Sequence, residues 1–592
     1  MNYKHKLIFL FIFFLAAAFR LTGINWDQGF HLHPDERAIV LAVTPLHLPT
    51  SWSQFLSAQS PLNPHFFAYG SFPMYLLKFT GFLMSYVNPL FSQYDLINLL
   101  GRFLSASFDL GTLFILFLLG RRIVNTRVGL LAAFFYAVSV LPIQLSHFYA
   151  VDTQLTFFLI LTLYLLIRFY EKASFLKAMA IGACIGFAFA TKISATVILV
   201  SVVITLIADF GLLIIKHPLH PSHWLKHIPK FLFSLIKDLF IMFIVGIAMY
   251  AILEPYAFID FTNFWQQTLA QSAMTKNAFI FPYTLQYVTI TPYFYELKNI
   301  FLWGLGPILA TICFLGVIYG TYMAIMKHRK QEKWAQDFIL LAFFWAYFLT
   351  VGSFAIGFMR YMLPLYPLFC LFGAMYVFAT LNDVQRLFRR NSARAITSTF
   401  GMEMIKSRWS FVICYLLFVI VLLVWPVSFM HIYSQPNMRV EATNYINQMI
   451  PEGETLAVEH WDDELPLASA SNYRVQTLPL YDPDTPEKWT SVDQQLKESD
   501  YLIIASNRLY VPLHKLANCQ KYAPPHCYPI TDQYYQNLFA GKPVAPGVTF
   551  KEIKEFVIYP TIPFLNIPIN DQGADESFTV YDHPKVMIFK KQ

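Results

Sequence analysis

Long apolar runs separated by short polar turns are the feature that most restricts what this chain can fold into. A helix that crosses a bilayer needs about 20 mostly apolar residues. We count eleven candidate spans, at roughly 7–24, 98–120, 128–145, 153–170, 176–191, 193–215, 231–253, 299–326, 337–352, 361–380 and 409–430. The run at 73–92 is also apolar, but Lys78 and its proline-bounded ends favour a helix lying in the membrane interface.

The composition supports a membrane protein. Hydrophobic residues make up 56% of the chain and charged residues 13%, whereas a soluble domain carries about 25% charged residues. This deficit excludes a disordered chain, a nucleic-acid-binding tail and an ordinary cytosolic enzyme. The first apolar run could instead be a cleaved signal peptide with Lys4 and Lys6 as its basic region. Its length, and Arg20 where a cleavage site would fall, favour a membrane span.

Charge divides the chain into two regions. Residues 1–430 hold 30 Lys and Arg against 16 Asp and Glu, a net charge of +14, whereas residues 431–592 hold 13 against 20, a net charge of −7. We therefore expect a polytopic α-helical membrane domain at 1–430 and a separate small α/β domain at 431–592. For the second domain the pattern predicts a helix at 437–449 and strands at 455–459, 500–505, 556–559, 578–581 and 585–589.

Basic residues set the expected orientation, because cytoplasmic loops of membrane proteins are enriched in Lys and Arg. With a cytoplasmic N-terminus, 22 of the 30 basic residues in 1–430 fall inside and 8 outside. The sequence thus predicts a multi-pass protein of the plasma or inner membrane, with a first outer loop at about 25–97 and an extracytoplasmic C-terminal domain. Cys519 and Cys527 lie in polar sequence of that domain and could pair in an oxidising compartment.

Charged and polar side chains gather on the expected outer face. Charge at a membrane edge is costly and by default marks function. The motifs, in chain order, are Asp35-Glu36, Asn63-Pro64-His65-x4-Gly70-Ser71-x-Pro73, Gly101-Arg102-x6-Asp109, Ser146-His147-x4-Asp152, Ala190-Thr191-Lys192 and Arg360-Tyr361-x2-Pro364.

In their order and sidedness, these motifs resemble the GT-C superfamily of glycosyltransferases. The resemblance is closest to the protein O-mannosyltransferase and lipid A aminoarabinose transferase family, and it covers most of residues 1–430. It implies a GT-C-like helical domain and a polyprenyl- or dolichyl-phosphate sugar as donor. It also implies transfer with inversion on the non-cytoplasmic face. The chain departs from the family where some members carry a Lys-Pro-Pro motif, because His65 stands in that loop instead.

The chemistry of such a transfer explains the carboxylates. An acceptor hydroxyl loses a proton as it attacks, and a nearby carboxylate can take that proton as general base. We assign this role to Asp35, with Glu36 as a neighbour that orients the acceptor; the alternative is a solvated loop pair. His31 and His33 alternate with Asp35, so an extended segment would place them on one face. A divalent metal ion held by Asp35, Glu36 and His33 is therefore a second possible use of this segment.

The phosphate leaving group needs cations that stabilise its growing charge. Lys192, Arg360 and Arg102 compete for it, Arg as a bidentate partner and Lys as a point charge; Arg102 could instead snorkel to the interface. Further candidates for binding the donor phosphate and sugar are Tyr361, Tyr69, His65, Asp152, His147 and Glu254. Each could instead have a purely structural role, such as a tyrosine at the membrane interface or a residue that ends a helix.

The sequence therefore predicts a membrane glycosyltransferase whose partners are the lipid-phosphate sugar donor, membrane lipid and a protein, lipid or glycan acceptor, without nucleic acid. A transporter or flippase of a lipid-linked sugar is the first rival, but the charges lie at one face and no two-fold repeat is evident. A non-catalytic glycan-binding scaffold is the second rival. In the outer domain, Trp461-Asp462-Asp463-Glu464 could bind a cation or form a solvated loop.

Overall fold

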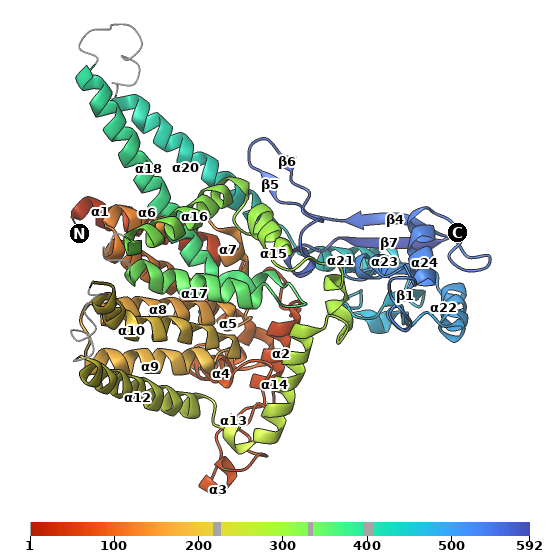
Figure 1. Cartoon of the computed structure of the whole chain (residues 1–592). Helices are drawn as coiled ribbons and strands as arrows, with labels where there is room; N and C mark the ends of the chain where they lie inside the picture. The colour runs from red at the N-terminus through yellow and green to blue at the C-terminus, as the bar shows by residue number, and fades with distance from the viewer. Residues whose placement is uncertain (1, 217–226, 330–334, 395–407) are drawn as a thin grey trace.

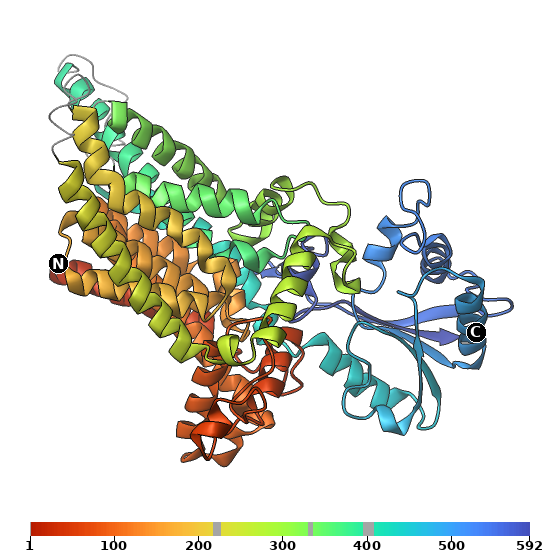
Figure 2. The ribbon, with the colours of Figure 1, turned by 60° about the horizontal axis from the view of Figure 1, so that its bottom comes forward.

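The computed structural model describes residues 2–216, 227–329, 335–394 and 408–592. Parts of the basic loops that are predicted to face the cytoplasm, at 217–226, 330–334 and 395–407, lie outside the described residues. A helical bundle is followed by a C-terminal domain built on a sheet (Figure 1). Turned by 60°, the molecule keeps the N-terminus at the end of the bundle opposite the C-terminal domain (Figure 2).

Helices overlap all of the predicted spans. They are α1 (Tyr3–Leu21), α5 (Tyr94–Ile123), α6 (Thr126–Ala137), α7 (Val140–Ser146), α8 (Asp152–Glu171), α9 (Phe175–Phe189), α10 (Ile198–Lys216), α12 (Ile228–Leu253), α16 (Pro307–Arg329), α17 (Ala335–Val351), α18 (Tyr366–Arg394) and α20 (Arg408–Met430). Within the described residues, five helices are long and apolar enough to cross a membrane, or up to six if the bent pair α6 and α7 is one span. The chain is an integral membrane protein, and the count of eleven spans stays a prediction.

Two predicted spans are interrupted. The chain bends by 61° between α6 and α7, where Ser139 lies between the helices and Pro142 occupies the first turn of α7, a position that tolerates a missing N–H. The predicted span 299–326 begins with a π-helical turn at Ile300–Gly304 and becomes α-helical only at Pro307. Gly306 between them has a φ of +77°, a conformation that favours glycine.

The loop at about 25–97, predicted to lie outside, carries three helices, α2 (Pro34–Val43), α3 (Trp52–Phe55) and α4 (Ser71–Ser85). Between spans, α13 (Tyr256–Ile259), α14 (Phe261–Lys276) and α15 (Phe294–Asn299) extend the same end of the bundle. Gly70 lets the loop before α4 lie against the turn after α9, because its N–H donates to the Thr191 carbonyl at 3.0 Å and a Cβ there would lie 1.9 Å from the Ala190 carbonyl oxygen.

The C-terminal domain holds a five-stranded mixed sheet in the order β2-β1-β3-β7-β4. Its strands are β1 (Thr455–Glu459), β2 (Arg474–Leu478), β3 (Tyr501–Ile504), β4 (Phe550–Phe556) and β7 (Val586–Lys591). β1 pairs in parallel with β2 and β3, and β7 runs antiparallel to β3 and β4. Helices α21 (Met438–Met449), α22 (Pro486–Glu498), α23 (Val511–Lys515) and α24 (Pro529–Phe539) complete the domain, with the small hairpin β5 (Thr561–Ile562) and β6 (Ile567–Pro568).

The structure confirms the predicted helix at 437–449 and the strands at 455–459, 500–505 and 585–589, apart from their end residues. The strand predicted at 556–559 is wrong because the ladder is formed earlier, by β4. The strand predicted at 578–581 is also wrong: Glu576–Thr579 forms the short helix α25, whose N-cap Asp575 accepts a hydrogen bond from the Ser577 N–H. β2 was not predicted because it carries no apolar run: only one of its five residues is buried. A disulfide joins Cys519 and Cys527.

A buried polar cluster attaches the C-terminal domain to the bundle. Asp582 accepts hydrogen bonds from the Gln144 side-chain amide at 3.0 Å and from the Tyr433 hydroxyl at 2.7 Å. His583 lies between Asp582 and Asp571, at 2.5 and 2.9 Å. Burial disfavours the imidazolium, but the two carboxylates outweigh it and raise the pKa of His583 to about 10. The segment after α25 therefore fixes the sheet over one end of the helices.

Candidate active site

A cavity of about 530 Å³ lies between the helical bundle and the C-terminal domain. Its bundle side is formed by α2, the loop before α4, the turn after α9 and the segment before α18. Five of the predicted site residues line it, namely Asp35, Tyr69, Lys192, Arg360 and Tyr361. This volume falls in the range of about 300–1,000 Å³ that is usual for small-ligand sites.

Asp35 lies in the first turn of α2, which begins at Pro34. Acidic side chains are favoured there by the helix dipole. Its Oδ1 accepts a hydrogen bond from the Tyr69 hydroxyl at 2.9 Å, and its Oδ2 forms an ion pair with Arg360 Nη1. Burial disfavours the charge on Asp35, but the Arg360 charge and these hydrogen bonds outweigh it and hold the pKa of the carboxyl below its ordinary value.

Two cations and a second carboxylate continue this cluster. Lys192 Nζ contacts Asp152 Oδ1 at 2.8 Å and lies 4.5 Å from the centre of the Tyr361 ring. Arg360 Nε is 4.0 Å from Asp152 Oδ2, and neither atom has a hydrogen-bond partner among the described residues. Asp152 itself is buried, with 2% of its side chain exposed. The cluster therefore holds Lys192 and Arg360 side by side at the cavity wall, with the buried Asp152 behind them.

Glu36 and Arg102 lie elsewhere. Successive residues of a helix point about 100° apart, so Asp35 faces the cavity while Glu36 enters the protein interior. Arg102 binds Glu36 through Nε at 2.9 Å and Nη2 at 2.6 Å, and it binds Asp27 through Nη1 at 2.9 Å and Nη2 at 2.6 Å. All three side chains are fully buried. This arrangement differs from the predicted roles: Glu36 does not line the cavity, and the guanidinium of Arg102 is already bound by two carboxylates.

The predicted metal ligands Asp35, Glu36 and His33 do not converge. Residues 34–43 are helical rather than extended, so the alternation of side chains on one face does not apply. His33 caps α2 by accepting a hydrogen bond from the Glu36 N–H, and its ring packs on Phe148 and Tyr581. The Glu36 carboxylate is bound by Arg102. Among the described residues, no group of three or more His, Cys, Asp or Glu side chains is placed to hold a metal ion.

The remaining predicted residues support the site from outside the cavity lining. His65 Nδ1 lies 3.5 Å from Asp260 Oδ2. His147 is buried, with its ring nitrogens 2.9 Å from the carbonyl oxygens of Ile143 and Thr22. Glu254 is buried and accepts a hydrogen bond from the Ser71 N–H at 2.9 Å, and burial raises its pKa to about 8. Glu254 thereby anchors the loop that presents Tyr69.

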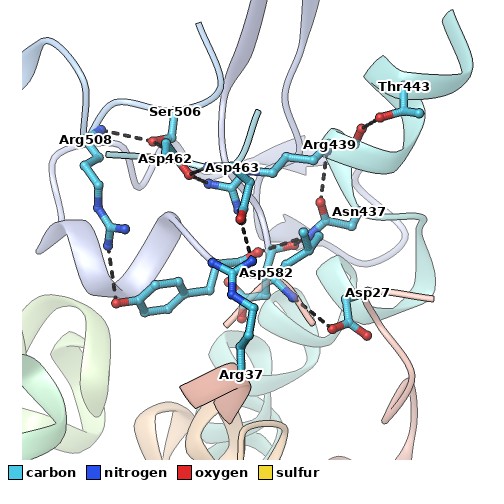
Figure 3. Close-up of polar contacts among 12 residues, drawn as sticks. Asp27, Arg37, Asn437, Arg439, Thr443, Asp462, Asp463, Ser506, Arg508 and Asp582 are labelled. Carbon is cyan, nitrogen blue, oxygen red and sulfur yellow. Dashed lines mark hydrogen bonds and ion pairs between the residues drawn. The ribbon is translucent and has the colours of Figure 1, made fainter. Parts of the chain in front are cut away.

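The C-terminal domain supplies residues that the sequence did not identify as part of the site. Arg37, two residues after Asp35, reaches Asp463 Oδ1 at 2.7 Å and so joins α2 to this domain (Figure 3). The domain's side of the cavity is formed by Arg439, Trp461, Asp462, Asp463, Arg508 and Tyr581. Only the acidic run at 461–464 gave a signal in the sequence, because the others are isolated residues far from the motifs of the bundle.

Comparison with known proteins agrees with the sequence-based resemblance. The model of the dolichyl-phosphate-mannose-protein mannosyltransferase family matches residues 81–226. This match confirms the resemblance to GT-C glycosyltransferases. No curated protein matches the chain.

Three solved structures have a general likeness to the whole chain or part of it. The oligosaccharyltransferase AglB from Archaeoglobus fulgidus, in complex with an inhibitory peptide and a dolichol-phosphate, is 13% identical with a TM-score of 0.48, covering 100% of this chain and 88% of AglB. ArnT from Cupriavidus metallidurans, bound to undecaprenyl phosphate, is 12% identical with a TM-score of 0.45, covering 87% and 95%. The Pmt1-Pmt2 protein O-mannosyltransferase complex of S. cerevisiae, bound to the sugar donor, is 19% identical with a TM-score of 0.30, covering 45% and 34%.

Proposed function

We propose that this protein is a membrane glycosyltransferase that moves a sugar from a polyprenyl- or dolichyl-phosphate donor to an acceptor hydroxyl. The observation that carries the proposal is the cavity in which one carboxylate, Asp35, lies beside two cations, Lys192 and Arg360. A lipid-phosphate sugar has its tail in the bilayer and its reactive carbon at the interface. The cavity opens between the apolar bundle and a polar domain, which suits such a donor.

Arg360 and Lys192 hold the donor phosphate in this proposal. Arginine binds phosphate with paired N–H groups, and lysine adds a compact positive charge. Arg360 is paired with Asp35 before the donor binds, so the phosphate competes for the same guanidinium. Asp152 keeps Lys192 in place at 2.8 Å while its own Oδ2 faces Arg360. These two cations stabilise the negative charge that grows on the phosphate as it leaves.

Asp35 then acts as the general base. While it is bound to Arg360, its pKa is too low for it to accept a proton readily. Once the phosphate engages Arg360, the carboxylate loses part of that partner and becomes more basic. The acceptor oxygen bonds to the anomeric carbon as its proton passes to Asp35. The bond from that carbon to the phosphate oxygen breaks with its electron pair on the phosphate, and attack opposite the leaving group inverts the anomeric carbon.

The proposal also assigns a side of the membrane. A cytoplasmic N-terminus and an extracytoplasmic 431–592 place the cavity on the non-cytoplasmic face. The distribution of basic residues supports this orientation, as does the position of the N-terminus opposite the C-terminal domain (Figure 2). A reporter that is active only after translocation, fused after Gln592, should be active. Activity of a cytoplasm-specific reporter at that point would overturn the assignment.

Mass spectrometry of glycans tests the function whichever acceptor the enzyme uses. A deletion strain should lack one glycan modification, and the wild-type gene should restore it. The Asp35→Asn variant, produced at the same level in the same membranes, should fail to restore it. A glycan profile unchanged by the deletion would contradict the proposed function.

A further inference from the structure

The loops at the carboxyl end of the C-terminal sheet form a wall of the cavity. β1 is flanked by β2 on one side and β3 on the other, and all three strands are parallel. The chain therefore leaves β1 and β3 toward the same edge, at the place where the strand order reverses. In open α/β sheets, ligands bind in the crevice outside the carboxyl ends of such strands. Trp461 to Asp463 follow β1, Arg508 follows β3, and all of them line the cavity.

Trp461 is held there in an unfavourable backbone conformation. Its φ is +78°, a left-handed value that bulky residues rarely adopt, and 46% of the residue is exposed. Single exposed hydrophobic residues are common and need no explanation, but a strained one in a cavity wall does, since such strain concentrates at functional sites. Strong contacts on the next residue maintain the conformation: Asp462 binds Arg439 Nη2 at 2.5 Å and also accepts from the Ser506 hydroxyl (Figure 3).

Charged side chains around Trp461 form ion pairs. Three guanidinium groups face three carboxylates: Arg37 pairs with Asp463, Arg439 with Asp462, and Arg508 with Glu576. Arg439 is 1% exposed, yet its Nε and Nη1 have no hydrogen-bond partner among the described residues. Such a wall offers ion-paired donors and acceptors beside a flat apolar ring, with Glu576 behind Arg508 and outside the cavity lining. These properties match a sugar, which has hydroxyls that both donate and accept and a C–H face that stacks on an aromatic ring.

We infer that the crevice after β1 and β3 is the acceptor subsite and that the acceptor is a carbohydrate whose ring stacks on Trp461. This inference rests on the proposed function and adds the acceptor class to it. The link to the reacting centre is short. Asp35 is two residues from Arg37, Arg37 binds Asp463 at 2.7 Å, and Asp463 is two residues from Trp461. Asp35, Arg37 and Trp461 all line the same cavity, so a sugar on Trp461 shares that cavity with the base.

Binding of free sugars tests the inference without the donor. The full chain is placed in lipid nanodiscs, free of glycoside detergents. Saturation-transfer NMR then measures a panel of methyl hexopyranosides and short oligosaccharides, with uncharged serine- and threonine-containing peptides as the competing class. We expect at least one glycoside to bind, with affinity reduced about tenfold in Trp461→Ala, the size of a good aromatic contact. Trp461→Phe should stay close to wild type. The matched control is Trp52→Ala, because Trp52 is exposed on α3 outside the cavity lining.

A stability measurement separates binding from a structural role. Trp461→Gly relieves the left-handed conformation, because glycine adopts it without strain, so its Tm should equal or exceed that of the wild type while glycoside affinity falls. A Tm several degrees lower would assign Trp461 to the fold and overturn the inference. So would glycoside binding that Trp461→Ala leaves unchanged, a panel in which no glycoside binds, or Trp461-dependent binding of the peptides alone.

Donor binding in the same samples distinguishes the two proposals. Undecaprenyl phosphate should bind the wild type and bind Lys192→Ala more weakly. If phosphate binding is independent of Lys192 and Arg360, the proposed function fails whatever the glycosides do. If phosphate binding depends on them but glycoside binding does not depend on Trp461, the carbohydrate acceptor alone is refuted.

Discussion

Replacing Asp35 by Asn should have opposite effects on turnover and on donor binding. The amide keeps the shape of the carboxylate and can still accept the hydrogen bond from Tyr69, but it cannot take a proton at neutral pH. Loss of a general base alone costs about 10²–10⁴ in rate, which corresponds to roughly 2.7–5.4 kcal/mol of transition-state stabilisation. Donor binding should tighten, because the phosphate no longer has to displace a carboxylate from Arg360.

The size of that tightening follows from the contact that is lost. A hydrogen bond to a charged group contributes about 1.5–3 kcal/mol, so removing the competing carboxylate should improve phosphate affinity by about 10- to 100-fold. Arg360 is 11% exposed, and its next carboxylate, Asp152, is 4.0 Å away, so its charge would otherwise be poorly compensated. Phosphate then becomes its best partner.

Two separate assays measure the two effects. Isothermal titration of nanodisc-embedded protein with undecaprenyl phosphate gives the affinity, and restoration of glycans in the deletion strain gives the activity. Asp95→Asn, a change at an exposed carboxylate in the first turn of α5, serves as control. If Asp35→Asn retains more than about a tenth of wild-type turnover, Asp35 is not the base. If phosphate affinity is unchanged or weaker, Arg360 does not exchange Asp35 for phosphate.

Four further outcomes are expected. Lys192→Ala and Arg360→Ala should weaken undecaprenyl phosphate binding and turnover together; wild-type values in both variants would place the phosphate elsewhere. Glu36→Gln should lower stability by about 1.5–3 kcal/mol, because charge-assisted hydrogen bonds from Arg102 to Glu36 are lost while Asp27 still compensates the Arg102 charge, and thermal unfolding should show this while the folded fraction still binds donor. Because the pKa of His583 is raised in the folded protein, its contribution to stability is complete below about pH 6.5 and declines as the pH rises to about 10. The Tm should therefore fall across that interval. The fall should be smaller in His583→Gln. Cys519→Ser should destabilise the C-terminal domain by roughly 2–3 kcal/mol, the value for a short disulfide-closed loop, and an unchanged Tm would show that the bond is absent from the purified protein.

The sequence by itself determined that this protein folds in a membrane. Apolar runs of membrane-spanning length have few alternatives in water, and the split of charge between 1–430 and 431–592 separates the helical bundle from the sheet-bearing domain. The expectation that charged and polar side chains gather on one membrane face also identified residues that the fold brings together. Asp35, Tyr69, Lys192, Arg360 and Tyr361 all line one cavity. These properties depend on local composition and on the cost of placing charge in a bilayer, both of which can be read without knowing the packing.

Only the tertiary structure decided how neighbouring residues divide their roles. Asp35 and Glu36 are adjacent and chemically alike, but a helical segment turns one toward the cavity and the other toward the buried Arg102. Pro34 followed by two acidic residues is a pattern typical of a helix start, but that pattern does not tell which carboxylate faces the cavity. The contribution of the C-terminal domain was hidden for a related reason. Trp461 and Arg508 approach α2 because parallel strands bring their following loops to one sheet edge, and such contacts join residues that are hundreds of positions apart in the chain.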